Sequence, residues 1–445
     1  MVNGMKTFSK GGVHPAGKHK ELSNAIAIRN AEVKGTLIFP MSMHIGAPAE
    51  CLVQVGDEVN EGMLIGKAAG FISANIYCSV KGVVKEIKDI YLASGMKTKA
   101  VVVETAEDFK PGEVQFEPSD WEKLTPKEIV DKIAAAGIVG LGGATFPVNV
   151  KYSIPPDSKV DALVINGVEC EPYLTADHRL MLEKTAQLFI GMRIIAKAIN
   201  APKIFVGIEA NKPDAIQKMT EYAAKNGGDI EIVPLQVKYP QGDEKQLLKA
   251  VIDKEIPSGK LPIAIGAVVS NVGTVNAVYE AVALGKPLYE RVVTVTGGGI
   301  KNPGNYLVKV GTKVGDLVEQ CGGFTDDAVK LIMGGPMMGF TFSDLDTPVI
   351  KGTSGILVLS AAEAKKGQRT ACLQCGRCLK ACPIGLQPTK LFKKINAGKY
   401  ADALKLNLMD CKECGCCAFV CPANIPLVQG FRLGKRMAPK PPKKG

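Results

Sequence analysis

Two copies of one cysteine pattern stand near the end of this 445-residue chain. The first copy reads Cys372-x2-Cys375-x2-Cys378-x3-Cys382-Pro383, and the second reads Cys411-x2-Cys414-x2-Cys417-x3-Cys421-Pro422. Three thiolates two residues apart can wrap one face of an iron–sulfur cube, while the fourth, next to proline, points away and ligates the other cube. The spacing predicts two 4Fe–4S clusters with crossed ligand sets, namely Cys372, Cys375, Cys378 and Cys421 for one, and Cys411, Cys414, Cys417 and Cys382 for the other.

Zinc is the alternative occupant of such cysteines. Zinc sites prefer two CxxC pairs per ion and do not call for a third cysteine or a CxxxCP ending, so iron–sulfur clusters are the favoured interpretation. The N-terminal segment lacks the apolar stretch of a secretion signal, which favours metal binding over disulfides. Cys416 lies between ligands and is interpreted as a bystander packed near the cluster.

A glycine-rich stretch earlier in the chain has the composition of a phosphate-binding loop. Gly140, Gly142 and Gly143 would let a phosphate approach the backbone closely, and Lys151 would add a positive charge. The pattern departs from the dinucleotide fingerprint GxGxxG, because Ala144 and Thr145 follow Gly143, and Thr145 stands where the third glycine is required. A plain glycine turn is the competing interpretation.

Polar residues also follow two predicted strands. Asn166, Glu169 and Glu171 come directly after one strand, where amide and carboxylate groups could bind a ring and its hydroxyls, although a helix-capping loop would use the same residue types. A second strand-to-helix turn runs from Ser270 through Asn271 to Thr274, and its free N–H groups would suit a phosphate or a ring oxygen.

The elements that must position these residues alternate between strand and helix. Helices are expected at Pro126–Ala136, Ala176–Asn200 and Lys212–Asn226, and strands at Ala162–Ile165, Lys203–Gly207 and Ile230–Val233. Such alternation predicts a parallel sheet covered on both faces over residues 120–285. Ligands bind such sheets at the carboxyl ends of their strands, where the polar residues above would lie.

The flanking regions have other patterns, so the expected fold is multidomain, α/β and α+β. Residues 1–115 hold short Val- and Ile-rich strands separated by turns, similar to the barrel-sandwich (lipoyl/biotinyl-like) fold, but their Gly70–Cys78 hairpin has no carrier lysine. Residues 290–345 are strand-rich with many glycines, and helices carry the cysteines at 360–434 in a helical ferredoxin-like arrangement. The basic tail at 435–445 is expected to be disordered.

Charge and hydropathy limit the kinds of partner that the chain is expected to bind. Lys and Arg number 55 against 44 Asp and Glu, and this excess favours anionic ligands or proteins. Aromatic residues make up 6% and the body of the chain has no basic stripe, so nucleic acid is not expected. The longest charge-free stretch, Leu261–Tyr279, contains polar residues and a proline, so it predicts a strand, a turn and a helix start, and any membrane association would be peripheral.

Taken together, these motifs resemble a known family. GLGGATFP, NGVECEP and SNVGT are similar to the flavin- and NADH-binding subunit of respiratory complex I, and still more so to the C subunits of the Rnf complexes, which are membrane-bound ferredoxin:NAD⁺ oxidoreductases. Further Rnf-type features are FSKGGVHP at 8–15, HIGAPAE at 44–50, YPQGDEKQL at 239–247, GGPMMG at 334–339 and KGTSGILVL at 351–359. This resemblance covers nearly the whole chain.

The resemblance implies cofactors and roles for single residues. Noncovalent FMN would bind in a Rossmann-like α/β domain, and residues 290–345 would be a soluble-ligand-binding β-grasp (SLBB) domain. The FMN-binding residues would be Gly140, Gly142, Gly143, Lys151, Asn166, Glu169, Asn271 and Thr274, and Phe146 and Glu171 would face NADH. Complex I sequences usually carry Asp where this chain has Val168, so one ribityl contact must differ. Asp243 and Glu244 are weaker nucleotide candidates, with a solvated loop as the alternative.

The resemblance also implies a cellular setting. The expected enzyme would pass electrons between NAD(H), FMN and the two clusters, on the cytoplasmic side of a bacterial membrane. Its partners would be the membrane subunits, which transport Na⁺ or H⁺, and a ferredoxin-like subunit. The rival hypotheses are a soluble NADH-oxidising donor to a cobalamin or amino-acid reductase, and a nonenzymatic iron–sulfur relay. Cobalamin-type relatives open directly with the flavin domain, whereas about 115 residues precede it here.

Overall fold

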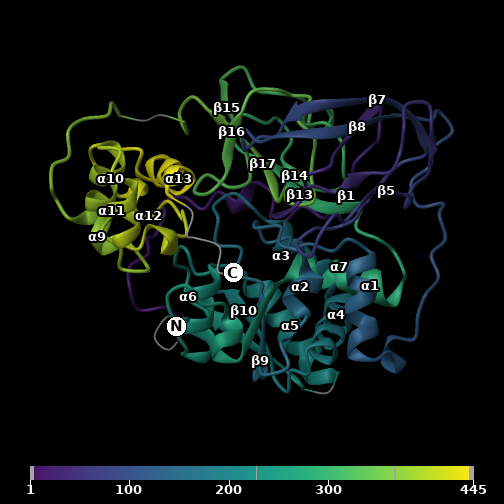
Figure 1. Ribbon diagram of the computed structural model, residues 1–445, viewed down its shortest axis with the longest axis horizontal. Helices are drawn as coiled ribbons and strands as arrows, with labels where there is room; N and C mark the ends of the chain where they lie inside the picture. The colour runs from purple at the N-terminus through teal and green to yellow at the C-terminus, as the bar shows by residue number, and fades with distance from the viewer. Residues whose placement is uncertain (1–4, 227, 365–366, 440–445) are drawn as a thin grey trace.

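The computed structural model describes residues 5–226, 228–364 and 367–439. In Figure 1 the teal α/β region lies below, the sheets of the N-terminal and green regions lie above it, and the yellow helices of the cysteine region stand beside both. The predicted multidomain fold is therefore confirmed, and the four regions are in close contact.

The α/β region has a parallel sheet in the order β11 (Ile230–Leu235), β10 (Ile204–Glu209), β9 (Ala162–Asn166) and β12 (Ala267–Asn271). Successive residues of β9 face opposite sides, so Leu163 packs into one apolar core and Val164 into the other. The helices on the two faces are α1 (Pro126–Ala135), α2 (Val148–Tyr152), α3 (Ala176–Glu183), α4 (Thr185–Ala198), α5 (Pro213–Lys225), α6 (Glu244–Ile252) and α7 (Val272–Ala283).

The single helix expected at Ala176–Asn200 is two helices. Lys184 leaves the helical conformation, with φ −122° and ψ 27°, between α3 and α4. The Thr185 hydroxyl donates to the carbonyl of Met181 at 2.7 Å, so a side chain occupies an acceptor that a continuous helix gives to a backbone N–H. The break leaves α3 as a short helix, and Asp177 in its first turn contacts Asn271 at the carboxyl end of β12.

The N-terminal region is a sandwich of two small antiparallel sheets with one core. One sheet has the order β2 (Thr36–Pro40), β8 (Lys97–Thr105), β7 (Gly82–Tyr91) and β4 (Glu58–Val59), and the other has β3 (Glu50–Cys51), β5 (Leu64–Lys67) and β6 (Ile76–Tyr77). Phe39 and Val101 of the first sheet pack with Ile65 and Ile76 of the second. This agrees with the predicted barrel-sandwich architecture.

The glycine-rich region forms a sheet that recruits strands from outside residues 290–345. Its order is β1 (Arg29–Asn30), β14 (Gly304–Lys309), β13 (Glu290–Thr296), β17 (Gly355–Ser360), β15 (Ala328–Met333) and β16 (Phe340–Phe342), with α8 (Val314–Gln320) packed on it. Every residue of β17 is buried, so this strand is the middle of the sheet although it follows the expected boundary.

The cysteine region, residues 367–439, contains the short helices α9 (Arg377–Ala381), α10 (Pro388–Asn396), α11 (Tyr400–Lys405), α12 (Cys416–Phe419) and α13 (Leu427–Met437). The expectation of a disordered tail from residue 435 is wrong at its start, because Lys435 lies in α13 and donates to the carbonyl of Cys411 at 2.6 Å. Residues 440–445 lie outside the described part of the chain. Short 3₁₀ turns at Lys20–Leu22, Trp121–Lys123, Pro262–Ile265 and Leu408–Asp410 complete the fold.

No helix among the described residues has the length and apolar character that a bilayer crossing requires. The charge-free stretch at Leu261–Tyr279 instead contains a 3₁₀ turn, β12 and most of α7. The predicted strand and helix start are confirmed, whereas the predicted turn between them is wrong, because α7 begins at Val272 directly after β12.

A fully buried lysine joins three of the regions. Lys351 follows the β15–β16 hairpin, and its ammonium donates to the carbonyls of Asn75 at 2.5 Å and Gly137 at 2.7 Å. Asn75 belongs to the sandwich and Gly137 to the end of α1, so one side chain connects the sheet region to both. Burial lowers the pKa of Lys351 from 10.5 to about 7.

This contact predicts a pH-dependent stability. Between pH 7 and 10.5 the unfolded chain holds a proton on Lys351 that the folded chain has released, so stability rises with pH by up to about 1.4 kcal/mol per pH unit. We expect Lys351→Met to lose this part of the slope in denaturant unfolding at pH 7.5 and 9.5. Lys85→Met, at a lysine 55% exposed, is the control and should keep the wild-type slope. Equal slopes in all three proteins would contradict the buried amine.

Candidate metal and nucleotide sites

Two amide side chains lie at the carboxyl ends of neighbouring strands in the α/β sheet, and this edge is called the strand-end mouth. Asn166 ends β9 and Asn271 ends the neighbouring strand β12, and the two residues are paired in register. The Asn271 side chain accepts from Gly273 N at 2.8 Å and so begins α7, while its Nδ2 donates to Asp177 at 2.7 Å. The two polar strand ends therefore lie next to each other at the carboxyl edge of the sheet.

The glycine loop lies across this mouth. The Thr274 hydroxyl of α7 accepts from Leu141 N at 2.9 Å, and Gly140 N donates to the carbonyl of Phe146 at 2.9 Å, which closes the loop. Gly142 is pressed on Asn271, since an added Cβ would lie 3.1 Å from the Asn271 Cβ. Gly143 has φ +122° and faces open space.

These residues fit the phosphate and ring of FMN. Gly142 and Gly143 are exposed, so their backbone can be approached closely from solvent. Lys151, in α2, is held by a 3.2 Å ion pair with Glu244 at the start of α6, and both side chains remain about one-third exposed, at 33% and 30%. An exposed backbone cradle with a positive charge nearby and two amides at the strand ends provides the donors that a phosphorylated ring needs.

Glu169 is used differently from what the resemblance implies. Its carboxylate accepts from the backbone N–H groups of Asp177 at 2.7 Å and His178 at 3.3 Å, at the N-terminus of α3. Glu169 itself has φ 46°, in the left-handed region, where the chain turns back toward that helix. This is the helix-capping arrangement that the sequence left open, and a contact from Glu169 to FMN stays a prediction.

Glu171 turns toward the sheet region. Its two oxygens accept from Met337 N at 3.1 Å and Met338 N at 2.9 Å, in the GGPMMG segment. Burial raises the pKa of Glu171 to about 7, against the lowering effect of those two N–H donors. The structure thus gives Glu171 an inter-region contact, while the roles of Glu171 and Phe146 toward NADH remain predictions.

Three buried cations support the loops and were missed by sequence reasoning. Lys20 donates to the carbonyls of Glu169, Glu171 and Leu174 at 2.5–3.0 Å. Lys212 donates to the carbonyl of Val168 at 2.7 Å, and burial lowers its pKa to about 8. Arg291, whose pKa burial lowers to about 10, lies beside Asp177 and the glycine loop carbonyl of Leu141. No local pattern marks these cations, because each acts on a segment distant in sequence.

Asp243 and Glu244 are also placed by local contacts. Asp243 caps α6 by accepting from Lys245 N at 3.0 Å, and Glu244 pairs with Lys151. Glu244 therefore contacts Lys151, the predicted phosphate-binding lysine. Asp243 instead caps a helix.

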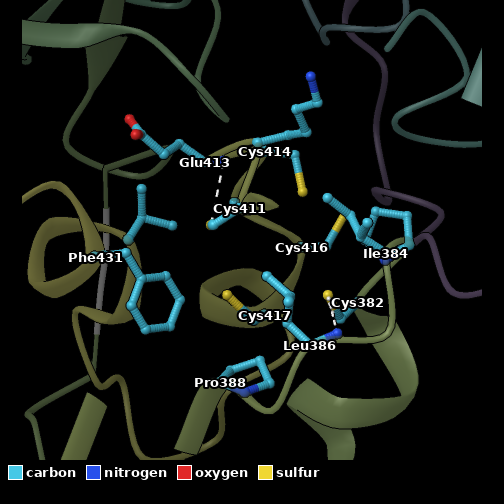
Figure 2. A pocket seen from close by; sticks show the side chains of 14 residues that line it. Cys382, Ile384, Leu386, Pro388, Cys411, Glu413, Cys414, Cys416, Cys417 and Phe431 are labelled. Atoms are coloured by element: carbon cyan, nitrogen blue, oxygen red, sulfur yellow. Dashed lines mark hydrogen bonds between the residues drawn. The ribbon is translucent and has the colours of Figure 1, made fainter. Parts of the chain in front are cut away.

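The second cysteine set lines one pocket. Cys382, Cys411, Cys414 and Cys417 all border it, and Figure 2 shows sulfur atoms of Cys382, Cys414 and Cys417 around the same space. Backbone N–H groups of Leu386 and Glu413 donate to the sulfurs of Cys382 and Cys411 at 3.3 and 3.4 Å. Cys382 comes from the first sequence copy, so the fold brings together the crossed set that the spacing predicts.

The first set is more open. Cys372 and Cys375 are exposed and Cys378 is buried. Burial raises the pKa of the Cys378 thiol, and the nearby thiols of Cys421, Cys375 and Cys372 raise it further. For Cys417, burial and then the thiols of Cys414, Cys411 and Cys382 raise the pKa in the same way. Cys378 and Cys417 thus each have neighbours from their own crossed set.

The donor chemistry of the second cysteine set fits a 4Fe–4S cluster. In the described part of the chain, no group of three His, Cys, Asp or Glu side chains has the geometry of a single-ion site. The second set instead surrounds a cavity, and thiolates with amide N–H donors are the usual ligand environment of a 4Fe–4S cube. Cys416 also lines this pocket, and its thiol lies 3.9 Å from the carbonyl of Tyr239.

Comparison with known proteins agrees with this geometry. Residues 6–108 match the RnfC barrel sandwich hybrid domain, 133–280 the Nuo51 FMN-binding domain, 292–341 the SLBB domain and 371–425 the 4Fe-4S dicluster domain. The chain is 48% identical to the C subunit of the proton-translocating ferredoxin:NAD(+) oxidoreductase complex of Clostridium ljungdahlii, over 96% of this chain and 93% of that protein.

Two further relatives carry related names. The chain is 43% identical to the C subunit of the Na(+)-translocating ferredoxin:NAD(+) oxidoreductase complex of Acetobacterium woodii, over 96% of both chains. It is also 43% identical to the C subunit of the ion-translocating oxidoreductase complex of Rhodobacter capsulatus, over 97% of this chain and 83% of that one. The chain belongs to the RnfC family. Its cofactors are FMN and 4Fe–4S clusters, and it is one component of a multisubunit oxidoreductase.

The pocket geometry predicts which cysteine serves which cluster. We expect Cys382→Ser to remove or perturb only the paramagnetic resonance signal of the cluster held by Cys411, Cys414 and Cys417. Cys421→Ser, its counterpart in the second sequence copy, should affect only the other signal. Loss of the other signal in each variant would show that each sequence copy holds its own cluster.

The glycine cradle predicts the effect of a side chain at Gly142. Gly142→Val would push the loop from Asn271, and we expect FMN to bind about tenfold more weakly or worse in a fluorescence titration, which corresponds to about 1.4 kcal/mol. Gly70→Ala is a suitable control, because its added Cβ would meet only Ala47 at 3.9 Å. Native affinity in Gly142→Val would place the FMN phosphate elsewhere.

Proposed function

We propose that this chain is the NAD(H)-reacting subunit of an Rnf-type ferredoxin:NAD⁺ oxidoreductase. It would exchange electrons between NAD(H), FMN and two 4Fe–4S clusters, while other subunits link that transfer to Na⁺ or H⁺ transport. The observation that carries the proposal is a bridge between the strand-end mouth and the Cys411–Cys417 loop. The chain segment at 239–242 touches Asn166 at one end and Cys414 at the other.

The residues of the protein would bind FMN and the nicotinamide nucleotide and orient them for electron transfer. FMN accepts a hydride from NADH and can release its electrons singly, which suits acceptors that take one electron each. Gly140, Gly142 and Gly143 would cradle its phosphate, with the Lys151 ammonium balancing the charge. Asn166 and Asn271 would orient the ring and ribityl, and Thr274 holds the loop in place through Leu141. Phe146, half-buried beside this loop, would contact the nicotinamide nucleotide.

The exposed cysteines support a protein partner at the other end of the relay. Cys372 and Cys375 are exposed, and Leu373 between them is 66% exposed. Residues 367–439 hold twelve Lys or Arg against three Asp or Glu, and most of the chain's positive excess is in this region. An acidic ferredoxin-like subunit would dock there by charge attraction. Peripheral attachment at the cytoplasmic face of the membrane, through partner subunits, completes the proposal.

The rival functions receive less support. A soluble donor to a cobalamin or amino-acid reductase is not favoured, because the relatives named above match this chain from the sandwich region to the cysteine region. A relay without a working flavin site is opposed by the glycine cradle and by the match of residues 133–280 to an FMN-binding family.

An artificial electron acceptor tests the proposal without partner subunits. We expect the anaerobically loaded protein to oxidise NADH with ferricyanide when FMN is bound, and to lose that activity when FMN is removed and regain it on addition. Zinc-loaded protein with FMN would be the control for a flavin-only reaction. Protein that binds FMN but never bleaches it with NADH would overturn the proposed function.

A further inference from the structure

Tyr239 connects the flavin-binding region to the cysteine pocket. Its side chain is 1% exposed, and its hydroxyl donates to the carbonyl of Cys414 at 2.7 Å. Three residues later, the carbonyl of Gly242 accepts from the Asn166 side chain at 2.8 Å. A single short loop between β11 and α6 therefore contacts both the strand-end mouth and the Cys411–Cys417 loop, which is called the ligand loop.

The N-terminal segment fixes this loop from the outside. Val13 and Tyr239 exchange two backbone hydrogen bonds, at 2.8 and 2.9 Å, and Gly12 N donates to the carbonyl of Ala381 at 3.0 Å. Gly11, with φ +63°, lies so close to Cys382 that an added Cβ would be 2.6 Å from its carbonyl carbon. The segment thus binds both Tyr239 and the crossed ligand of the same pocket.

Glu171 forms a parallel connection. The Met337 and Met338 amides donate to its carboxylate, and the same two residues contact the ligand loop and the helix that follows it. An added Cβ at Gly415 would lie 2.8 Å from the Met337 carbonyl oxygen, and Arg432 donates to the Met338 carbonyl at 3.0 Å. The ligand loop is therefore held from two sides.

Between these contacts lies a small apolar core. Tyr239 packs with Val13, Ala381, Cys414 and Cys416, and all five are buried. Little water can reach this space, so the Cys414 carbonyl depends on the Tyr239 hydroxyl as its side-chain donor. Hydrogen bonds behind a ligand orient it, and a cluster's potential depends on such bonds and on solvent exclusion.

We propose that Tyr239 is a positioning residue for the cluster of Cys382, Cys411, Cys414 and Cys417, and that its hydroxyl fixes the ligand loop against the flavin-binding region. The proposal rests on the proposed function and adds a specific residue to it. Removal of the hydroxyl would leave the Cys414 carbonyl unpaired and let the ligand loop relax away from the mouth. The first cluster, whose cysteines lie outside this apolar core, would be unaffected.

The test compares Tyr239→Phe with wild-type protein, both full length and anaerobically loaded. We expect the midpoint potential of the second cluster to shift in a redox titration followed by paramagnetic resonance, with the first cluster unchanged. After mixing with NADH, that cluster should be reduced about fivefold more slowly or worse, while flavin bleaching stays within about twofold of wild type. Cys382→Ser identifies which signal is the second cluster.

Tyr306→Phe is the matched control. Tyr306 is 4% exposed and lies in the sheet region, so this variant loses a buried hydroxyl away from the clusters and should keep both potentials. If Tyr239→Phe cannot be loaded with iron, Val13→Ala is tested in its place. This variant loosens the packing against Tyr239 but keeps the Tyr239 hydroxyl as a hydrogen-bond donor. A shift confined to the second cluster supports the proposal.

Unchanged potentials and rates in the loaded variant would overturn the role of Tyr239. The potentials are measured with a chemical reductant, so they remain informative even if NADH fails to reduce the wild-type protein. That last result would contradict the proposed function alone, and the two failures are therefore distinguishable.

Discussion

Electrons cross a protein only over short, fixed gaps, so the proposed flavin site at the strand ends and the proposed cluster site beside it must be held at a fixed separation. In this chain the contact is a hydrogen bond from Tyr239 to a cysteine carbonyl, with Asn166 bound at the other end of the same loop. The N-terminal segment and the GGPMMG segment both reinforce it. The sandwich and sheet regions can be understood as the frame that keeps these two segments in place.

Buried lysines hold several loops of the protein in place. Lys20, Lys212 and Lys351 are 5%, 0% and 0% exposed, and all three donate to backbone carbonyls of segments distant in sequence. Burial of an ammonium is costly unless its donors are satisfied, and carbonyl groups at loop turns satisfy them. Each lysine therefore specifies one arrangement of its loops, which a layer of apolar contacts alone would hold less strictly.

Sequence reasoning predicted the parts whose signals are local. Cysteine spacing indicated the two sets, and strand-to-helix alternation placed Asn166 and Asn271 at one sheet edge. It could not assign Glu169 between a ring contact and a helix cap, because the same carboxylate suits both. It also missed β1 and β17 as members of the glycine-rich sheet, and the Tyr239 bridge, since these depend on pairing between remote segments. The family resemblance supplied FMN and NADH, which no residue pattern could name.

An anaerobic titration with NADH, followed by paramagnetic resonance, tests the central claim most directly. We predict that NADH alone reduces clusters in protein that contains FMN, and that it leaves them oxidised in the same protein stripped of FMN, although dithionite reduces them in both. Clusters that dithionite reduces but NADH never does, with FMN bound, would contradict the claim that one chain joins the nucleotide site to the relay.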